Sequence, residues 1–75
     1  MKDVGFVSSN PTNVRILELL RKREGVDLKT ISKFTRIPQV TVKTVMEELK
    51  RRGLVVEEEG IFRLSDEGLE VLKRL

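Results

Sequence analysis

Residues 28–56, with the sequence LKTISKFTRIPQVTVKTVMEELKRRGLVV, predict two helices that are joined by a tight turn and followed by a strand. In the second helical segment, apolar residues recur at the i, i+3, i+4, i+7 spacing that buries one face of a helix: Val42, Val45, Met46 and Leu49. The open face at the start of this helix is polar and basic, as major-groove reading of DNA requires. The stretch therefore predicts a helix-turn-helix.

The flanking residues predict two further helices and a hairpin. The four expected helices span residues 11–25, 28–35, 38–52 and 66–75, with the capping or stop residues Asn10, Asp27, Gly53 and Ser65. Residues 54–56 and 61–64 predict two strands with Gly60 in their turn, and Val26 adds a single strand-like pairing. Residues 1–9 show no clear period, so we expect an N-terminal arm there, either disordered or with a short strand at residues 4–7, followed by one domain over residues 10–75.

The size and composition of the chain exclude several classes of function. Its 75 residues suffice for one core but leave no room for a deep substrate cavity. The sequence contains no Cys and no His, which removes thiolate and imidazole zinc ligands, disulfides, cysteine nucleophiles and the usual general base. No apolar run approaches the roughly 20 residues of a membrane span, and the first residues lack the apolar region of a secretory signal. We expect a cytoplasmic protein that works by binding, without membrane contact, metal, cofactor or enzymatic activity.

The charges are distributed unevenly along the chain. Residues 1–53 hold twelve Lys or Arg against six Asp or Glu, whereas residues 54–75 hold three against six. The basic part contains the predicted helix-turn-helix and would attract phosphate groups. The alternative is that these charges only solvate exposed helix faces.

The order of elements, together with the motifs IxxxTRIPxxTVxxxxxxLxxRGLV at residues 31–55 and LSDEGLEVL at residues 64–72, resembles the winged helix-turn-helix DNA-binding domains of bacterial and archaeal transcriptional regulators. The second motif is similar to the segment that leads out of the wing in multiple-antibiotic-resistance-type regulators. The resemblance covers residues 11–75. It implies a mainly helical α+β winged helix-turn-helix fold, with three helices, a two-stranded wing hairpin and a C-terminal helix. It also implies a small transcriptional regulator that binds double-stranded DNA in a sequence-specific manner.

The helix-turn-helix supplies candidate DNA contacts. The side chains expected to reach base edges lie at the start of the third predicted helix: Gln39, Val40, Thr41, Lys43 and Thr44. Gln39 can pair with adenine, Val40 and Thr41 can touch a thymine methyl group, and Lys43 and Thr44 can donate to a base or a phosphate. Phosphate contacts are expected from the second predicted helix and the turn, namely Lys29, Thr30, Lys33 and Arg36. For both sets the alternative is ordinary surface exposure.

Two features depart from the pattern of DNA-binding winged helices. Arg36 occupies a turn position often held by Gly, where a positive φ would cost roughly 1 kcal/mol or more unless the turn takes another shape. The wing tip carries Glu57, Glu58 and Glu59 instead of Arg or Lys, so we expect the wing to stand away from DNA or to pack against protein. A divalent-cation site is the less favoured alternative to a solvated acidic turn.

The last predicted helix suggests self-association. Its apolar residues spread over a wide arc, which predicts a homodimer with Val71 and Leu75 in the interface. The alternative is that the first predicted helix and the hairpin cover the arc. The runner-up function is a winged-helix protein-interaction module within a larger assembly, in which the acidic wing and the last helix dock onto another polypeptide. No small-molecule effector pocket is indicated.

Overall fold

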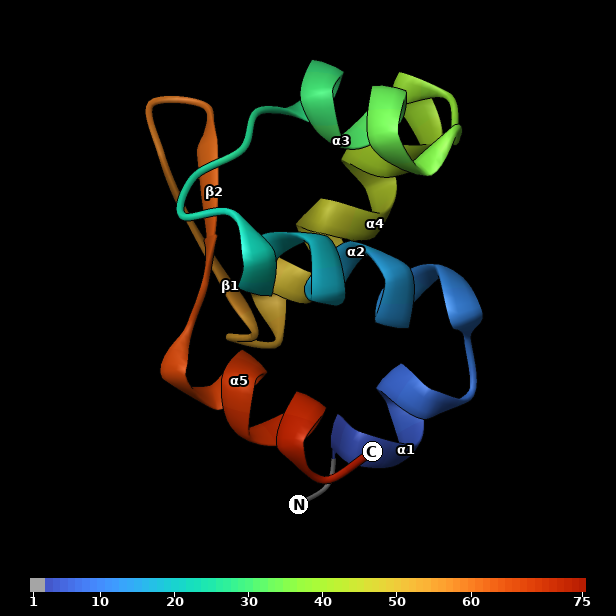
Figure 1. The fold of residues 1–75 in the computed structure, drawn as a ribbon, viewed down its shortest axis with the longest axis vertical. Helices are drawn as coiled ribbons and strands as arrows, with labels where there is room; N and C mark the ends of the chain where they lie inside the picture. The colour runs from blue at the N-terminus through green and yellow to red at the C-terminus, as the bar shows by residue number, and fades with distance from the viewer. Residues whose placement is uncertain (1–2) are drawn as a thin grey trace.

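The computed structural model describes residues 3–75, and this part of the chain holds five helices and one two-stranded hairpin. In chain order the elements are α1 (Asp3–Ser8), α2 (Pro11–Lys22), α3 (Leu28–Thr35), α4 (Gln39–Arg51), β1 (Val55–Glu58), β2 (Ile61–Leu64) and α5 (Asp66–Lys73). In Figure 1, α3 and α4 lie at one end of the molecule and α1 and α5 at the other, with α2 between them and the hairpin along one side. The expected mainly helical α+β class is confirmed. Across residues 3–75, no helix is both long and apolar enough to cross a membrane.

Three helices begin at the capping residues that the sequence predicts. In each case the side-chain oxygen of the cap accepts a backbone N–H: Asn10 from Thr12 (3.0 Å), Asp27 from Thr30 (2.8 Å) and Ser65 from Gly68 (3.0 Å). These bonds satisfy N–H groups that have no partner inside the first helical turn. The starts of α2, α3 and α5 therefore follow from these three capping residues.

The end of α4 follows from Gly53, as predicted. Gly53 has a φ of +77°, a left-handed conformation that costs glycine little. The Leu54 N–H donates to the Leu49 carbonyl at 2.9 Å, and the Gly53 N–H donates to the Lys50 carbonyl at 3.0 Å. Both bonds belong to the Schellman motif, in which the apolar residue after the glycine packs on the last turn. Leu54 and Leu49 are both buried, so this motif turns the chain into β1 across the core.

The helix α2 is shorter than the sequence suggests. We expected it to continue to residue 25, but it ends at Lys22, and Arg23 is extended with φ −126° and ψ 132°. The reason is the predicted pairing of Val26, which is confirmed: its N–H donates to the Phe62 carbonyl at 3.0 Å and its carbonyl accepts the Phe62 N–H at 2.8 Å. Residues 23–25 must unwind so that the chain can reach the hairpin.

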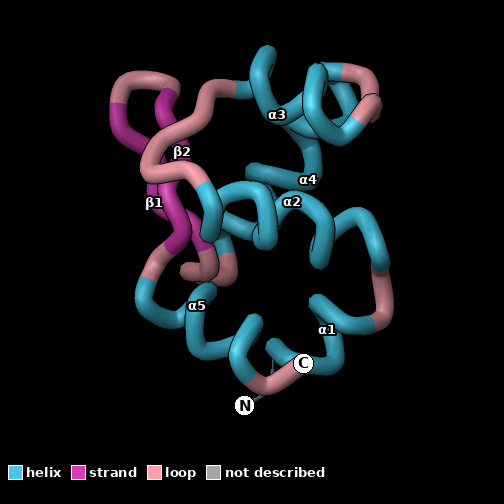
Figure 2. The backbone as a smooth tube through the Cα atoms, in the orientation of Figure 1, coloured by secondary structure: helices cyan, strands magenta, loops and turns pink. Residues whose placement is uncertain are grey.

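The hairpin has a tighter turn than expected. The strands β1 and β2 are antiparallel, and their pairing runs from Val55 opposite Leu64 to Glu58 opposite Ile61. Only Glu59 and Gly60 remain in the turn, with φ values of 51° and 82°. Positive φ at both central residues is typical of the two-residue type I′ turn that suits the twist of a hairpin. Because the turn takes only two residues, β1 extends through Glu58, and it begins at residue 55 instead of 54. Figure 2 shows the two strands and the short loop that joins them.

The prediction of a short strand at residues 4–7 is wrong. Asp3–Ser8 form the helix α1, which contacts α2 and α5, and Val7 is fully buried in the core. Arg52, beyond the end of α4, holds this helix: its guanidinium bonds the Asp3 carboxylate at 3.1 Å and lies 3.5 Å from the centroid of the Phe6 ring. Such a short helix is stable only through packing, which sequence periodicity does not record. Residues 1–2 of the predicted arm lie outside the described residues.

The helix α1 also changes the interpretation of the last helix. Val71 is 0% exposed, whereas Leu75, beyond the end of α5, is 49% exposed. The helix α5 packs against α1, α2 and β2, so the wide apolar arc is covered from within the chain. The prediction of Val71 as a dimer contact is therefore wrong. The expectation of a homodimer itself stays a prediction.

Candidate functional site

The turn between α3 and α4 is a closed, hydrogen-bonded structure. Arg36 has φ 60° and ψ 33°, and its N–H donates to the Ser32 carbonyl at 2.8 Å. The Ser32 hydroxyl donates to the Ile37 carbonyl at 2.5 Å, which fixes the residues just before α4. Arg36 thus adopts the left-handed conformation that glycine usually takes at this position, with its side chain exposed.

The five predicted base-contacting residues share the exposed surface at the start of α4. Gln39, Thr41 and Lys43 are exposed, and the Val40 side chain is 74% exposed. The Thr44 hydroxyl donates to the Val40 carbonyl at 3.2 Å, so it already has a partner within the helix. The exposure of this set is as predicted, but exposure does not test a contact with bases.

The predicted phosphate-contacting residues lie on α3 and its C-terminal turn. Lys29, Lys33 and Arg36 are exposed, whereas Thr30 is half-buried and its backbone N–H binds the Asp27 cap. The Thr30 side chain, and after it this backbone hydrogen bond, lower the pKa of the Asp27 carboxyl from its ordinary value, because both stabilise the charged form. Asp27 and Thr30 therefore have a structural role in starting α3.

The acidic end of the hairpin is partly neutralised within the chain. Lys50 Nζ lies 2.9 Å from Glu57 Oε1, which ties α4 to β1. The Glu58 and Glu59 side chains are exposed at and beside the turn. Among residues 3–75, no group of three or more His, Cys, Asp or Glu residues is arranged to hold a metal ion.

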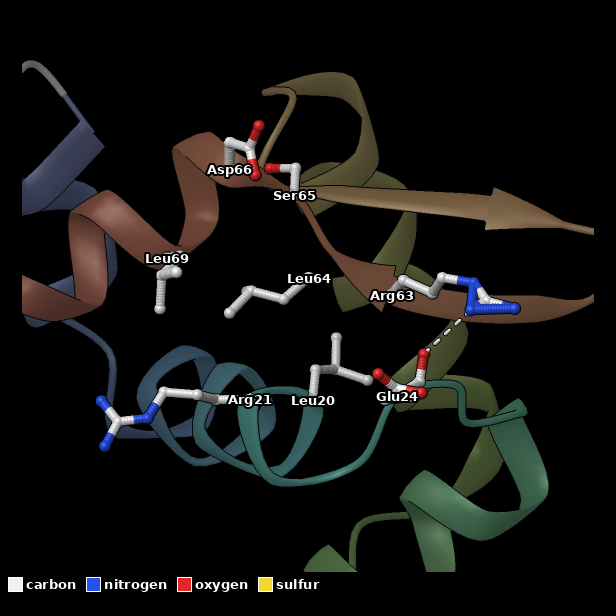
Figure 3. A pocket seen from close by; sticks show the side chains of 8 residues that line it. All are labelled: Leu20, Arg21, Glu24, Arg63, Leu64, Ser65, Asp66 and Leu69. Carbon is white, nitrogen blue, oxygen red and sulfur yellow. Dashed lines mark hydrogen bonds between the residues drawn. The ribbon is translucent and has the colours of Figure 1, made fainter.

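A first hollow, of about 340 Å³, lies between the end of α2, β2 and the start of α5 (Figure 3). The side chains of Leu20, Leu64 and Leu69 form its apolar middle, with charged residues at both ends. Its two cations are already engaged: Arg63 Nη1 donates to the Glu24 carbonyl at 3.1 Å, and Arg21 lies 3.7 Å from the Glu18 carboxylate. Asp66 and Glu24 balance these charges, so the hollow has no strong preference for a charged ligand.

A second hollow, of about 330 Å³, lies between α2 and α3. Its lining, which we call the α2–α3 groove, consists of Val14, Arg15, Glu18, Leu19, Lys22, Phe34 and Thr35. The Phe34 side chain is 52% exposed, and the Arg23 guanidinium lies 4.2 Å from the centroid of its ring. This groove forms only where α2 and α3 meet, so the sequence does not predict it. The one signal in the sequence was an aromatic residue outside the buried face of α3.

Residues 13–71 match the family model of the HemN C-terminal domain. This range covers most of the chain, so the protein belongs to the HemN C-terminal domain family, which is associated with radical SAM, oxygen-independent coproporphyrinogen oxidases. A search of curated proteins found no match.

This match overturns the resemblance to transcriptional regulators, and with it the prediction of a DNA-binding regulator. The motifs that carried the resemblance have structural roles in this chain. Gly53 takes a positive φ and Ser65 caps α5. A Cβ at Gly68 would overlap the carbonyl oxygen of Leu54, so the start of α5 can approach the chain before β1 only with glycine there. Motifs that are required for packing indicate the fold of a chain but do not indicate its function.

The chemistry of radical SAM enzymes depends on an iron–sulfur cluster, and such clusters are held by Cys thiolates. These 75 residues contain no Cys. The donor set of this chain therefore does not fit the cluster, and no step of that chemistry is assigned to it.

Proposed function

We propose that this chain is a non-catalytic, protein-binding domain associated with a heme-biosynthesis-related enzyme of the type for which its family is named. The single observation that carries the proposal is that this chain belongs to an enzyme-associated family but contains no Cys. Catalysis of that type must then take place on other residues, outside these 75, and the contribution of this domain is a binding one.

The arrangement of side chains supports a binding role. Core residues of all five helices and of both strands are buried, which gives a stable scaffold for a surface. Two large apolar side chains, Phe34 and Val40, remain exposed on α3 and α4. Exposed aromatic residues beside cations are enriched where proteins bind other proteins.

We further propose that the fold is of the winged-helix type, with α2, α3 and α4 as its three helices and β1 and β2 as its wing. The element order and the closed turn at Arg36 support this assignment. The same fold type serves many unrelated functions, so the assignment is compatible with protein binding.

The proposal is tested by complementation in trans. The catalytic part of a HemN-type enzyme from the same genome, with its own C-terminal domain removed, is assayed for coproporphyrinogen conversion with and without the 75-residue chain. We expect the chain to raise the activity of the catalytic part. We also expect the chain alone to show neither activity nor iron–sulfur absorbance after anaerobic reconstitution. Activity of the chain by itself, or no effect on the catalytic part, would contradict the proposal.

A further inference from the structure

The α2–α3 groove has an apolar floor that is open to a partner. Val14 and Leu19 on α2 and Phe34 on α3 supply this floor. Phe34 lies at the edge of the groove with half of its side chain exposed, whereas Phe62 is buried in the core and Phe6 is half-buried under Arg52. A half-exposed aromatic ring in a groove is the kind of anchor that contributes most to protein recognition.

The walls of the groove are held in place by polar contacts. Arg15 Nη2 donates to the Thr35 carbonyl at 2.5 Å, which joins the middle of α2 to the last turn of α3. The Thr35 hydroxyl donates to the Ile31 carbonyl at 2.6 Å, and Thr35 is itself buried. Arg23 fixes the other end by stacking on the Phe34 ring. A partner would therefore meet a surface that is already formed, and binding would require little ordering of the groove.

The rim of the groove is positively charged. Arg15, Lys22 and Arg23 surround it, and Glu18 is the one carboxylate that lines it within residues 3–75. Glu18 is paired with Arg21 at 3.7 Å, so its charge is offset from within α2. The hollow between α2, β2 and α5 differs in this respect, because its cations and carboxylates balance. The charge of the α2–α3 groove thus favours an acidic partner.

We propose that the α2–α3 groove binds an acidic amphipathic helix of a protein partner. The apolar side of that helix packs on Phe34 and Leu19, and its carboxylates face Lys22 and Arg23. The α2 side of the groove runs from Val14 to Lys22, which at about 1.5 Å per residue is about 12 Å, or roughly two turns of the partner helix. This inference rests on the proposed function in one respect: it places the acidic helix on the catalytic part of the enzyme.

The chemistry of the groove is tested by titrating the ¹⁵N-labelled chain with two synthetic peptides of 14 residues. Both are helical and carry the same Leu face, and the remaining positions are Glu in one peptide and Lys in the other. We expect the Glu peptide to shift the amide signals of Leu19, Lys22, Phe34 and Thr35 in a saturable way, and the Lys peptide to leave them unchanged. Equal shifts from both peptides, shifts centred on α4 or on the hollow beside β2, or no shifts would overturn the proposal. Concentration-dependent shifts of the groove without peptide would assign it to a second copy of the chain and would also overturn it.

Variants provide the matched controls. Phe34→Ala and the double variant Lys22→Glu with Arg23→Glu should each weaken binding of the Glu peptide about tenfold or more, because they remove the apolar anchor or reverse the rim charge. Phe34→Leu should retain most of the affinity. Lys43→Glu reverses a single charge on α4, outside the groove, and should have no effect. The dispersion of the amide spectrum verifies that each variant is folded, and equal losses from Lys43→Glu would contradict the groove assignment.

The complementation assay separates the two proposals. If the unmodified chain activates the catalytic part and Phe34→Ala activates it equally, the groove proposal is overturned and the proposed function stands. If the Glu peptide binds the groove but the unmodified chain does not act on the catalytic part, the proposed function is overturned and the groove remains an acidic-helix site.

Discussion

Substitutions at Val71 and Leu75 test whether Val71 on α5 belongs to the core and whether Leu75, just beyond α5, lies on the surface. Val71 is 0% exposed, so Val71→Ala removes two buried methyl groups and leaves a cavity, which should lower the free energy of unfolding by about 2–3 kcal/mol. A domain of this size has a total stability of about 4–11 kcal/mol, so the variant should remain folded. Its melting temperature should fall by about 8–24 °C, since 1 kcal/mol corresponds to about 4–8 °C in small domains.

Val71→Glu should have a larger effect, because it places a carboxylate where no partner or water can reach it. We expect this variant to be unfolded at neutral pH, as measured by far-UV circular dichroism. Leu75→Glu is the control: its side chain is 49% exposed, and its effect should lie within about 0.5 kcal/mol. A Val71→Glu variant that is as stable as the unmodified chain, but has lost self-association in sedimentation, would refute the placement of Val71 in the core.

Three further predictions concern the turn, a helix cap and α1. Arg36→Gly should stabilise the fold by about 0.5–1 kcal/mol in urea unfolding, because glycine relieves the strain of the left-handed conformation. Gly53→Ala should destabilise the fold by about 1 kcal/mol, because it introduces that strain. Changes of the opposite sign would contradict the positive φ values of these two residues. Asp27→Asn retains a side chain that can cap α3 but removes the titratable carboxyl group. Since the pKa of Asp27 in the fold lies below its ordinary value of 3.8, the stabilising effect of its charge is present above that pH and is lost as the pH falls through the folded pKa. The unmodified chain should therefore have a higher free energy of unfolding than Asp27→Asn near pH 6, and this difference should disappear in acid. A difference in the free energy of unfolding that grows on acidification would contradict the lowered pKa of Asp27. Arg52→Ala removes the partner of Asp3, so hydrogen exchange of the Val7 amide should accelerate more than that of Ile16 in α2, and equal acceleration would indicate general destabilisation instead.

The local rules of helix capping and turn formation account for the parts of the fold that could be predicted. Asn10, Asp27 and Ser65 each bind a backbone N–H two or three residues ahead, so their effect is visible within a short window of sequence. Gly53 ends α4 for an equally local reason. The class of fold and the borders of α3 and β2 follow from such signals.

The parts that could not be predicted depend on contacts between distant segments. The helix α1 has only six residues, and its position depends on Arg52, which is 49 residues away from Asp3. The early end of α2 depends on the pairing of Val26 with Phe62. Neither contact leaves a periodic pattern, which explains why a short strand was expected at the N-terminus and a longer helix after Pro11.

The candidate site likewise has features that local sequence signals predict and features that depend on contacts between distant segments. The exposure of Gln39, Val40 and Lys43 could be predicted from helical periodicity. The groove between α2 and α3 could not be predicted, because Phe34 lines it together with α2 residues that are distant from it in the sequence. The resemblance to a regulator family rests on glycines and caps that the fold itself requires, so it does not indicate the function.

The most direct test of the central claim is the binding of the 75-residue chain to the catalytic part of a HemN-type enzyme, measured by isothermal titration calorimetry. We predict saturable one-to-one binding, which Lys22→Glu with Arg23→Glu weakens about tenfold or more and Lys43→Glu leaves unchanged. The absence of binding by the unmodified chain would contradict the claim that it is a protein-binding domain of such an enzyme.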